Sequence, residues 1–211
     1  MRHRRKGRKF GRNPNHQRAL LRNLASALIL TERDAEGEDN APKVKGRIIT
    51  TLHKAKEVRP LVERCVTIAR RALPHQEAAD ALETDADRNT DAWRSWRNGD
   101  GWQEWNQAIA PVVAARRRAA RLLGDKEAVQ ILFEELAPRF AERDGGYTRI
   151  LKLATPRLGD AGARAILEFV GKNDRVKVAA TKPAFEADEE DESDTEVPVE
   201  KQAEATAEAE S

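Results

Sequence analysis

The first 31 residues of the chain contain nine lysine or arginine residues and no aspartate or glutamate. Like charges at this density repel one another and stay solvated unless a polyanion neutralises them. No folded domain needs such a segment for its own stability, so we interpret it as a nucleic-acid-binding arm. A flexible solubility tail and a transit peptide are the alternatives, although Asn13 and Pro14 lead straight into an apolar periodic stretch.

The other end of the chain has the opposite composition. Residues 186–211 contain twelve acidic residues and one lysine, so the net charge of +2 is a near-cancellation between unlike parts. Few apolar residues follow position 173, which predicts a disordered acidic tail over residues 174–211. We expect residues 1–173 to form a single compact domain that begins with a basic arm over residues 1–13.

The composition also excludes several classes of protein. A mean hydropathy of −0.74 and a charged fraction of 35% leave apolar material for only a modest core. The single cysteine excludes a disulfide framework, and no run of about 18 apolar residues predicts a membrane span. No basic leader precedes a short apolar segment, so we expect a cytoplasmic protein.

Apolar spacing and capping residues predict an α+β domain in which helices pack on a small mixed sheet. Asn13 is the expected cap of a first helix whose core face includes Leu24, Ala27 and Leu28. The predicted helices are 14–30, 52–73, 112–123 and 125–136. The predicted strands are 47–51, 147–153 and 163–170, of which the last two form a hairpin.

Two of these helices carry further expectations. The helix over 52–73 should be capped by Thr50 or Thr51, and Pro60 either bends it or marks a later start. Cys65 falls on its apolar stripe and has no partner cysteine, which indicates a small core residue. Asp125 should cap the helix over 125–136.

All four tryptophans lie between residues 93 and 105. Trp93 and Trp96 are three residues apart, as are Trp102 and Trp105, so each pair shares one face of a helix. The glycines between the pairs can turn the chain, which favours a small helical hairpin that closes on its own tryptophan core. The alternative is that exposed indoles contact RNA or a neighbouring protein.

Three blocks of the sequence resemble the bacterial large-subunit ribosomal protein seventeen family. The first is the arm, through Met1, Arg2, His3, Arg4, Gly7, Arg8, Arg12, His16, Ala19, Arg22 and Asn23. The second runs through Thr50, Thr51, Lys54, Ala55, Lys56 and Glu57. The third, and most specific, runs through Pro138, Arg139, Phe140, Arg143, Gly145, Gly146, Tyr147, Thr148, Arg149 and Ile150.

The chain departs from the family pattern at four places. Gln17 follows His16 where the family usually has arginine, so the charge of Arg18 is rotated by about 100 degrees around the helix. The loop over residues 33–46 is longer than usual, and residues 74–111 form a tryptophan-rich insertion. The acidic tail also exceeds the usual length.

The resemblance implies an α+β structural constituent of the large ribosomal subunit that binds large-subunit ribosomal RNA through its arm and supports subunit assembly. Its implied partners are this RNA and neighbouring ribosomal proteins, with no membrane and no small-molecule substrate. The RNA-binding candidates are basic residues of the arm and of the two other blocks. They are Arg2, His3, Arg4, Arg5, Lys6, Arg8, Lys9, Arg12, His16, Arg18, Arg22, Lys54, Arg139, Arg143 and Arg149.

Two interpretations fit the three arginines around the Gly-Gly turn, which are Arg139, Arg143 and Arg149. Together with Tyr147 they could form a second basic patch for RNA, because arginine grips phosphate bidentately and stacks on bases. Tyr147 could equally be a core or strand-edge aromatic, and Arg149 a solvated residue on the face of a strand.

Catalysis finds little support in the sequence. The four histidines lack metal-ligand spacing, and no phosphate-cradling glycine loop precedes a helix, so we expect no enzyme, cofactor or metal. The adjacent carboxylates Glu134 and Glu135 face different directions on a helix. A free architectural nucleic-acid-binding protein remains an alternative, with an RNA-processing enzyme as the least favoured one.

Overall fold

Helix α1 (Pro14–Leu30) begins where the capping residues predict. The Oδ1 of Asn13 accepts a hydrogen bond of 2.8 Å from the backbone N–H of Asn15, and Pro14 occupies the first turn. The buried face differs by one position from the expected one, because Ser26 is buried and Ala27 is exposed. The Ser26 hydroxyl donates to the Leu123 carbonyl at 3.1 Å, which satisfies this polar group inside the domain.

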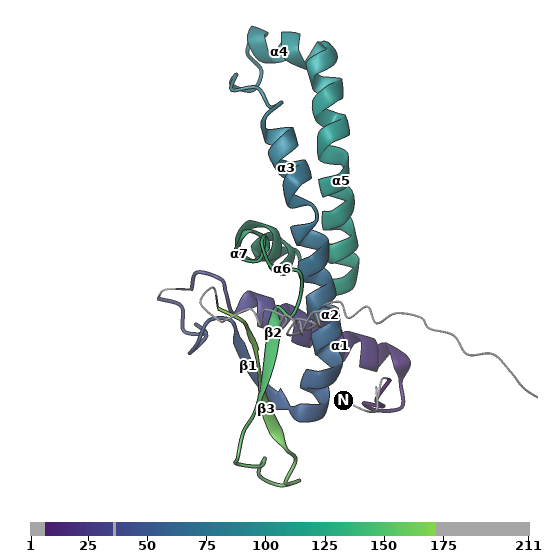
Figure 1. Ribbon diagram of the computed structural model, residues 1–211, viewed down its shortest axis with the longest axis vertical. Coiled ribbons are helices and arrows are strands. Elements are labelled where there is room, and N and C mark those ends of the chain that lie inside the picture. The colour runs from purple at the N-terminus through teal and green to yellow at the C-terminus, as the bar shows by residue number, and fades with distance from the viewer. Residues whose placement is uncertain (1–6, 36, 172–211) are drawn as a thin grey trace, which may run out of the picture. The chain divides into compact units, whose positions relative to one another are not determined.

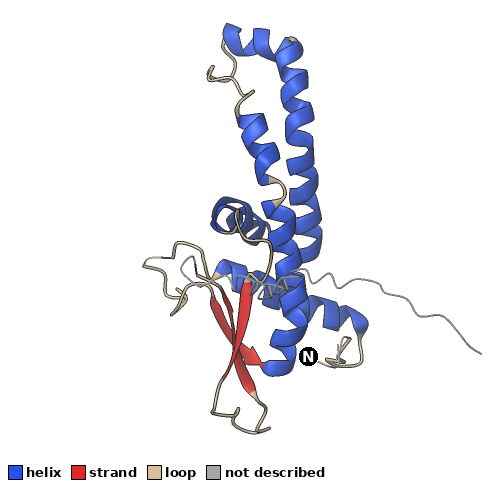
Figure 2. Ribbon diagram, in the orientation of Figure 1, coloured by secondary structure: helices blue, strands red, loops and turns tan. Residues whose placement is uncertain are grey.

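The protein is described here by a computed structural model, which covers residues 7–35 and 37–171 (Figure 1). The first six arm residues and the acidic tail, with its predicted disorder, lie outside the described residues. The described residues form the α+β domain that the sequence predicts (Figure 2).

The sheet has three strands, β1 (Arg47–Thr51), β2 (Thr148–Lys152) and β3 (Arg164–Phe169). Their order is β1-β3-β2, and both pairings are antiparallel. The expected hairpin is therefore confirmed, but the expected mixed sheet is wrong, because β1 and β2 both run opposite to the central strand. On the sheet face away from the core, Ile49 and Leu151 are 56% and 41% exposed.

Helix α2 (Leu52–Arg70) packs against all three strands and against α1. Thr51 is its cap by position, but its side chain makes no capping hydrogen bond. The helix starts at Leu52 and continues through Pro60, so a later start at this proline is wrong. It ends at Arg70 instead of Leu73, where α3 (Leu73–Asp80) begins.

Five helical segments follow α3 in the described residues. α4 (Asp91–Asn98) leads into α5 (Asp100–Leu123). α5 begins twelve positions before the predicted start and continues through Pro111. α6 (Lys126–Ile131) follows, capped as predicted by Asp125, which accepts from the backbone of Glu127 at 2.9 Å. A π-helical turn, η1 (Leu132–Leu136), and the short α7 (Ala137–Arg139) complete the helices.

The core lies between the inner face of the sheet and the helices α1, α2, α5 and α6. Cys65 is fully buried there, as predicted from its place on the apolar stripe. Tyr147 is also buried, with its ring centroid 5.2 Å from that of Phe140, and the ring centroids of Phe169 and Phe140 lie 6.2 Å apart. Tyr147 is therefore a core aromatic, and its ring is not available to stack on RNA.

The tryptophan segment forms a helical hairpin at the α4 end of α5 (Figure 1). Trp102 stacks on Trp105 at a centroid distance of 5.0 Å, and Trp96 meets Trp102 edge-on at 5.4 Å. The Arg97 guanidinium lies 4.2 Å from the Trp102 ring and 5.2 Å from the Trp93 ring. The predicted tryptophan hairpin is confirmed, although its indoles stay partly exposed.

Candidate nucleic-acid interface

A pocket of about 710 Å³ lies where the arm, the start of α2 and the loop between β2 and β3 meet. Two of its basic residues, Arg8 and Lys9, come from the arm, and Lys54 comes from α2. The structure thus brings together three candidates that lie up to 46 positions apart in the sequence. His53 and Arg157 line the same pocket, and neither is among the sequence-based candidates.

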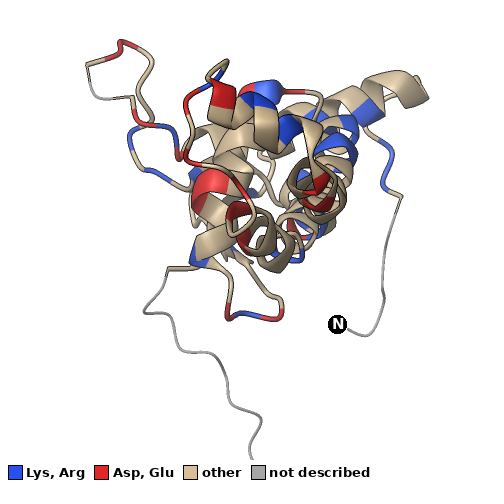
Figure 3. Ribbon diagram, turned by 90° about the horizontal axis from the view of Figure 1, so that it is seen from above, with Lys and Arg blue, Asp and Glu red and all other residues tan. Residues whose placement is uncertain are grey.

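The described half of the arm is anchored to the domain. The backbone N–H of Gly7 donates to the Glu57 carboxylate at 2.9 Å, and Gln17 donates to the Gly11 carbonyl at 2.8 Å. These contacts tie residues 7–13 to the start of α2 and to α1. In Figure 3, the described part of the arm, which precedes α1, carries basic residues and no acidic ones.

The pocket carries an excess of positive charge. Its acidic lining residue, Asp160, is paired with Arg157, whose Nε donates to the carboxylate at 2.8 Å. The hydrogen bond from Arg157, helped by the backbone N–H of Gly162, lowers the pKa of Asp160 to about 2. The Nε of Arg8 is buried and has no hydrogen-bond partner among the described residues. A buried guanidinium nitrogen without a partner is a donor that an added anion could satisfy.

Helix α1 carries further candidates beside the arm. Arg12, His16 and Arg18 are exposed, so they are free to reach an external partner. Arg22 is different, because its guanidinium donates to the Arg121 carbonyl at 3.1 Å, at the carboxy-terminal end of α5. It thereby satisfies a helix-end carbonyl that has no partner within its own helix.

The three arginines around the Gly-Gly turn are engaged within the domain. Arg139 donates two hydrogen bonds to the buried Glu32, at 2.6 and 2.8 Å. Arg143 donates to the Gly145 carbonyl at 3.2 Å. Arg149 pairs with Glu168, which is 4% exposed and also accepts from Arg47 at 2.6 Å. The second basic patch is therefore built largely from ion pairs that hold the sheet and α7 in place.

His53 and Arg157 show what the sequence analysis missed. Arg157 lies in the β2–β3 loop and His53 at the start of α2, and each looks like an isolated surface residue in the sequence. Their proximity depends on the β1–β3 pairing, in which Thr51 lies opposite Arg164. The sequence does show that Arg157 is a charged residue in a loop. It cannot show that this loop lies beside the start of α2.

The described residues contain no group of three or more side chains that could hold a metal ion. In the same part of the chain, none of the helices combines the length and the apolar character needed to cross a membrane.

Comparison with known proteins assigns the chain to a family. Residues 20–170 match the family model for ribosomal protein L17. The large ribosomal subunit protein bL17 of Rhodopirellula baltica is 61% identical over 89% of this chain and 90% of the relative. The bL17 proteins of Desulfovibrio desulfuricans and Agrobacterium fabrum are 35% and 34% identical over 87% and 89% of this chain, and over 77% and 99% of their own lengths. The chain belongs to the ribosomal protein L17 family.

Proposed function

We propose that the chain is a structural constituent of the large ribosomal subunit that binds large-subunit ribosomal RNA through its basic arm and supports subunit assembly. It acts in the cytoplasm, within the ribosome, beside neighbouring ribosomal proteins. Family membership supports the subunit, and the pocket beside the arm supports the RNA contact. The observation that carries the proposal is the convergence of Arg8, Lys9 and Lys54 on this pocket.

The chemistry of the pocket suits a phosphodiester backbone. Arginine binds phosphate through two parallel N–H groups, and each neutralised phosphate releases counterions into solution. Double-stranded RNA hides its base edges in a deep major groove, so recognition through shape and backbone is expected. The arm, anchored at Gly7, holds Arg8 and Lys9 toward such a backbone.

The test measures the affinity for deproteinised large-subunit ribosomal RNA over a series of salt concentrations. The arm variant changes Arg2, Arg4, Arg5 and Arg8 to Gln. If about six phosphates are neutralised by the whole protein, the logarithmic salt slope is on the order of −5, and the arm variant should flatten it markedly. An unchanged slope would place the RNA contact elsewhere.

The matched control changes the same number of positive charges outside the arm. Lys43 and Lys45 lie in the loop before β1, and Arg88 and Arg94 lie at the tryptophan hairpin, and all four are exposed. Changing them to Gln should leave the slope within about one unit of the unmodified value. Sedimentation of a cell lysate separates the alternative function, because a free architectural protein would not travel with the large subunit.

A further inference from the structure

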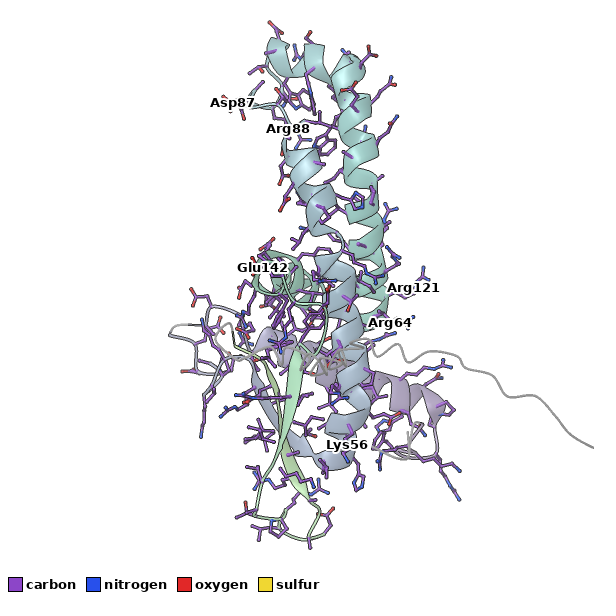
Figure 4. All side chains as sticks on the ribbon, viewed as in Figure 1. Lys56, Arg64, Asp87, Arg88, Arg121 and Glu142 are labelled. Carbon is purple, nitrogen blue, oxygen red and sulfur yellow. The ribbon has the colours of Figure 1, made fainter. Side chains whose placement is uncertain are left out.

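A second groove, of about 560 Å³, lies between α2 and α5 and shares no lining residue with the arm pocket. Arg64 lines it from α2 and Arg71 from the position that caps the end of this helix, and Arg118 and Arg121 line it from α5. Its lining also includes Ile68 and Leu122, which are half-buried and pack against the core. In Figure 4, Arg64 and Arg121 lie close together on the side of the helix pair away from Glu142.

The spacing of these residues explains why they meet. Arg64, Ile68 and Arg71 are separated by four and three positions, which places them on one face of α2. Arg118, Arg121 and Leu122 follow the same rule on α5. Because α2 and α5 pack side by side, the two basic faces form the walls of one groove.

The four guanidinium groups differ from the arginines that are held in ion pairs elsewhere in the domain. Arg139, Arg157 and Arg47 are each paired with a carboxylate. The groove arginines form no ion pair with any residue in the described ranges, and no acidic residue lines the groove. Four like charges gathered without a counter-charge repel one another, so they do not contribute to the stability of the free protein.

The groove is connected to the arm side of the protein through Arg22. This residue lies on α1, one turn after Arg18, and its guanidinium binds the carbonyl of Arg121. The side chain also approaches the turn after α5, where its Cδ lies 2.8 Å from the position that a Cβ on Gly124 would take. Positive charge thus extends from α1 along the end of α5 into the groove.

We propose that this groove, which we call the arginine groove, is a second RNA-binding surface that holds a phosphodiester segment of the same ribosomal RNA. The guanidinium groups bind the phosphates, and Ile68 and Leu122 offer an apolar floor for a ribose or base face. RNA fits better than a protein partner because it supplies a row of negative charges matched to four unpaired cations. The inference rests on the proposed function and adds a surface to it.

The test compares a groove variant, in which Arg64, Arg71, Arg118 and Arg121 become Gln, with the arm variant and the matched control. Affinity for deproteinised large-subunit ribosomal RNA is measured from low to moderate salt. Loss of up to four phosphate contacts should flatten the logarithmic salt slope by about 3 and weaken binding at low salt by more than tenfold. The control changes the net charge equally and should not reproduce this effect.

Folding is measured on the same variants. The groove variant should unfold at the same or a higher temperature than the unmodified protein, because mutual repulsion of the arginines is removed. A set of Arg→Lys changes at the same four positions keeps the charge and should keep most of the salt slope. If the Gln variant fails to fold, two double changes to Gln, Arg64 with Arg71 and Arg118 with Arg121, keep the proposal testable, because each should flatten the slope by about half as much.

Each outcome bears on a different statement. A groove variant that binds RNA like the control, while the arm variant loses affinity, would overturn the arginine groove and leave the proposed function intact. A groove variant that binds naked RNA normally but no longer sediments with the subunit would indicate a protein partner and would also overturn it. If neither the arm variant nor the groove variant changed the salt slope, the proposed function itself would fail.

Discussion

The guanidinium of Arg139 holds the carboxylate of Glu32 through two hydrogen bonds, although the two residues lie 107 positions apart in the chain. The pair joins the end of α1 to α7, and Glu32 is only 6% exposed. Gly46 lies against the same carboxylate, with a left-handed φ of 71° and no room for a Cβ, which would lie 2.6 Å from Glu32 Oε1. The loop before β1 thus closes over the ion pair.

Removing Arg139 should therefore destabilise the domain. The Arg139→Gln change leaves the Glu32 carboxylate buried without its counter-charge, and we expect a loss of about 3 kcal/mol in the free energy of unfolding. Chemical denaturation measures this loss. The double change of Glu32→Gln and Arg139→Gln should recover part of it, because no isolated charge remains. If the single variant kept full stability but bound RNA more weakly, Arg139 would belong to the RNA surface.

The pair of Arg157 and Asp160 predicts a pH dependence in the arm pocket. The pKa of Asp160 is lowered to about 2, chiefly by the hydrogen bond from Arg157. Because the folded pKa lies below the unfolded value of 3.8, the pair stabilises the loop above about pH 4, and this contribution is lost as the pH falls toward 2. In Arg157→Gln, NMR titration should show the pKa of Asp160 returning toward 3.8. The same pKa in Arg157→Gln and the unmodified protein would disprove the assignment.

Cys65 should be chemically inert while the domain is folded. Burial raises the pKa of its thiol to about 12, so almost no thiolate exists at pH 8. Iodoacetamide should leave the native protein unmodified and should alkylate one site after unfolding in denaturant, as read by mass spectrometry. Rapid alkylation of the native protein would show that this helix face opens. The Cys65→Ala variant, which lacks the thiol, is the control for modification at other side chains.

Deletion of residues 75–110 should leave a folded domain. None of the four tryptophans belongs to the main buried core. Ala79 of α3 and Val112 of α5 are buried, but they also lie outside this core. With a short linker between α2 and the rest of α5, we expect cooperative unfolding and a melting temperature within about 4 °C of the full chain, roughly 1 kcal/mol. Circular dichroism measures both. Loss of cooperative unfolding would show that the hairpin supports the main core. That residues 74–111 are an addition to the family domain remains a prediction.

Local signals in the sequence predicted the elements that depend on neighbouring residues. The cap at Asn13 placed the start of α1, and the β-branched run placed β1 at its observed bounds. The bounds of the two helices that contain a proline were predicted less well. Pro60 and Pro111 both lie inside helices, because packing of α2 and α5 against the core or each other outweighs one missing backbone hydrogen bond.

The site was harder to predict than the elements. Basic composition drew attention to Arg8 and Lys9, which line the arm pocket, and their contact with RNA remains a prediction. It could not separate an arginine that is free to bind from one that is used internally, such as Arg139 or Arg149, because the partners Glu32 and Glu168 are distant in sequence or across a sheet. The arginine groove escaped notice for the same reason, since its two walls come from helices that are separated by the whole hairpin.

The strand order β1-β3-β2 has a consequence for how the domain is made. The central strand is synthesised last, about 110 residues after β1, which at ~5–20 residues per second is a delay of roughly 6 to 22 s. During this time β1 lacks its partner strand, and the helices from α2 to α7 are synthesised, so the whole helical layer is complete before the central strand is made. Closure of the sheet onto a preformed helical layer is then the last step in folding of the described domain.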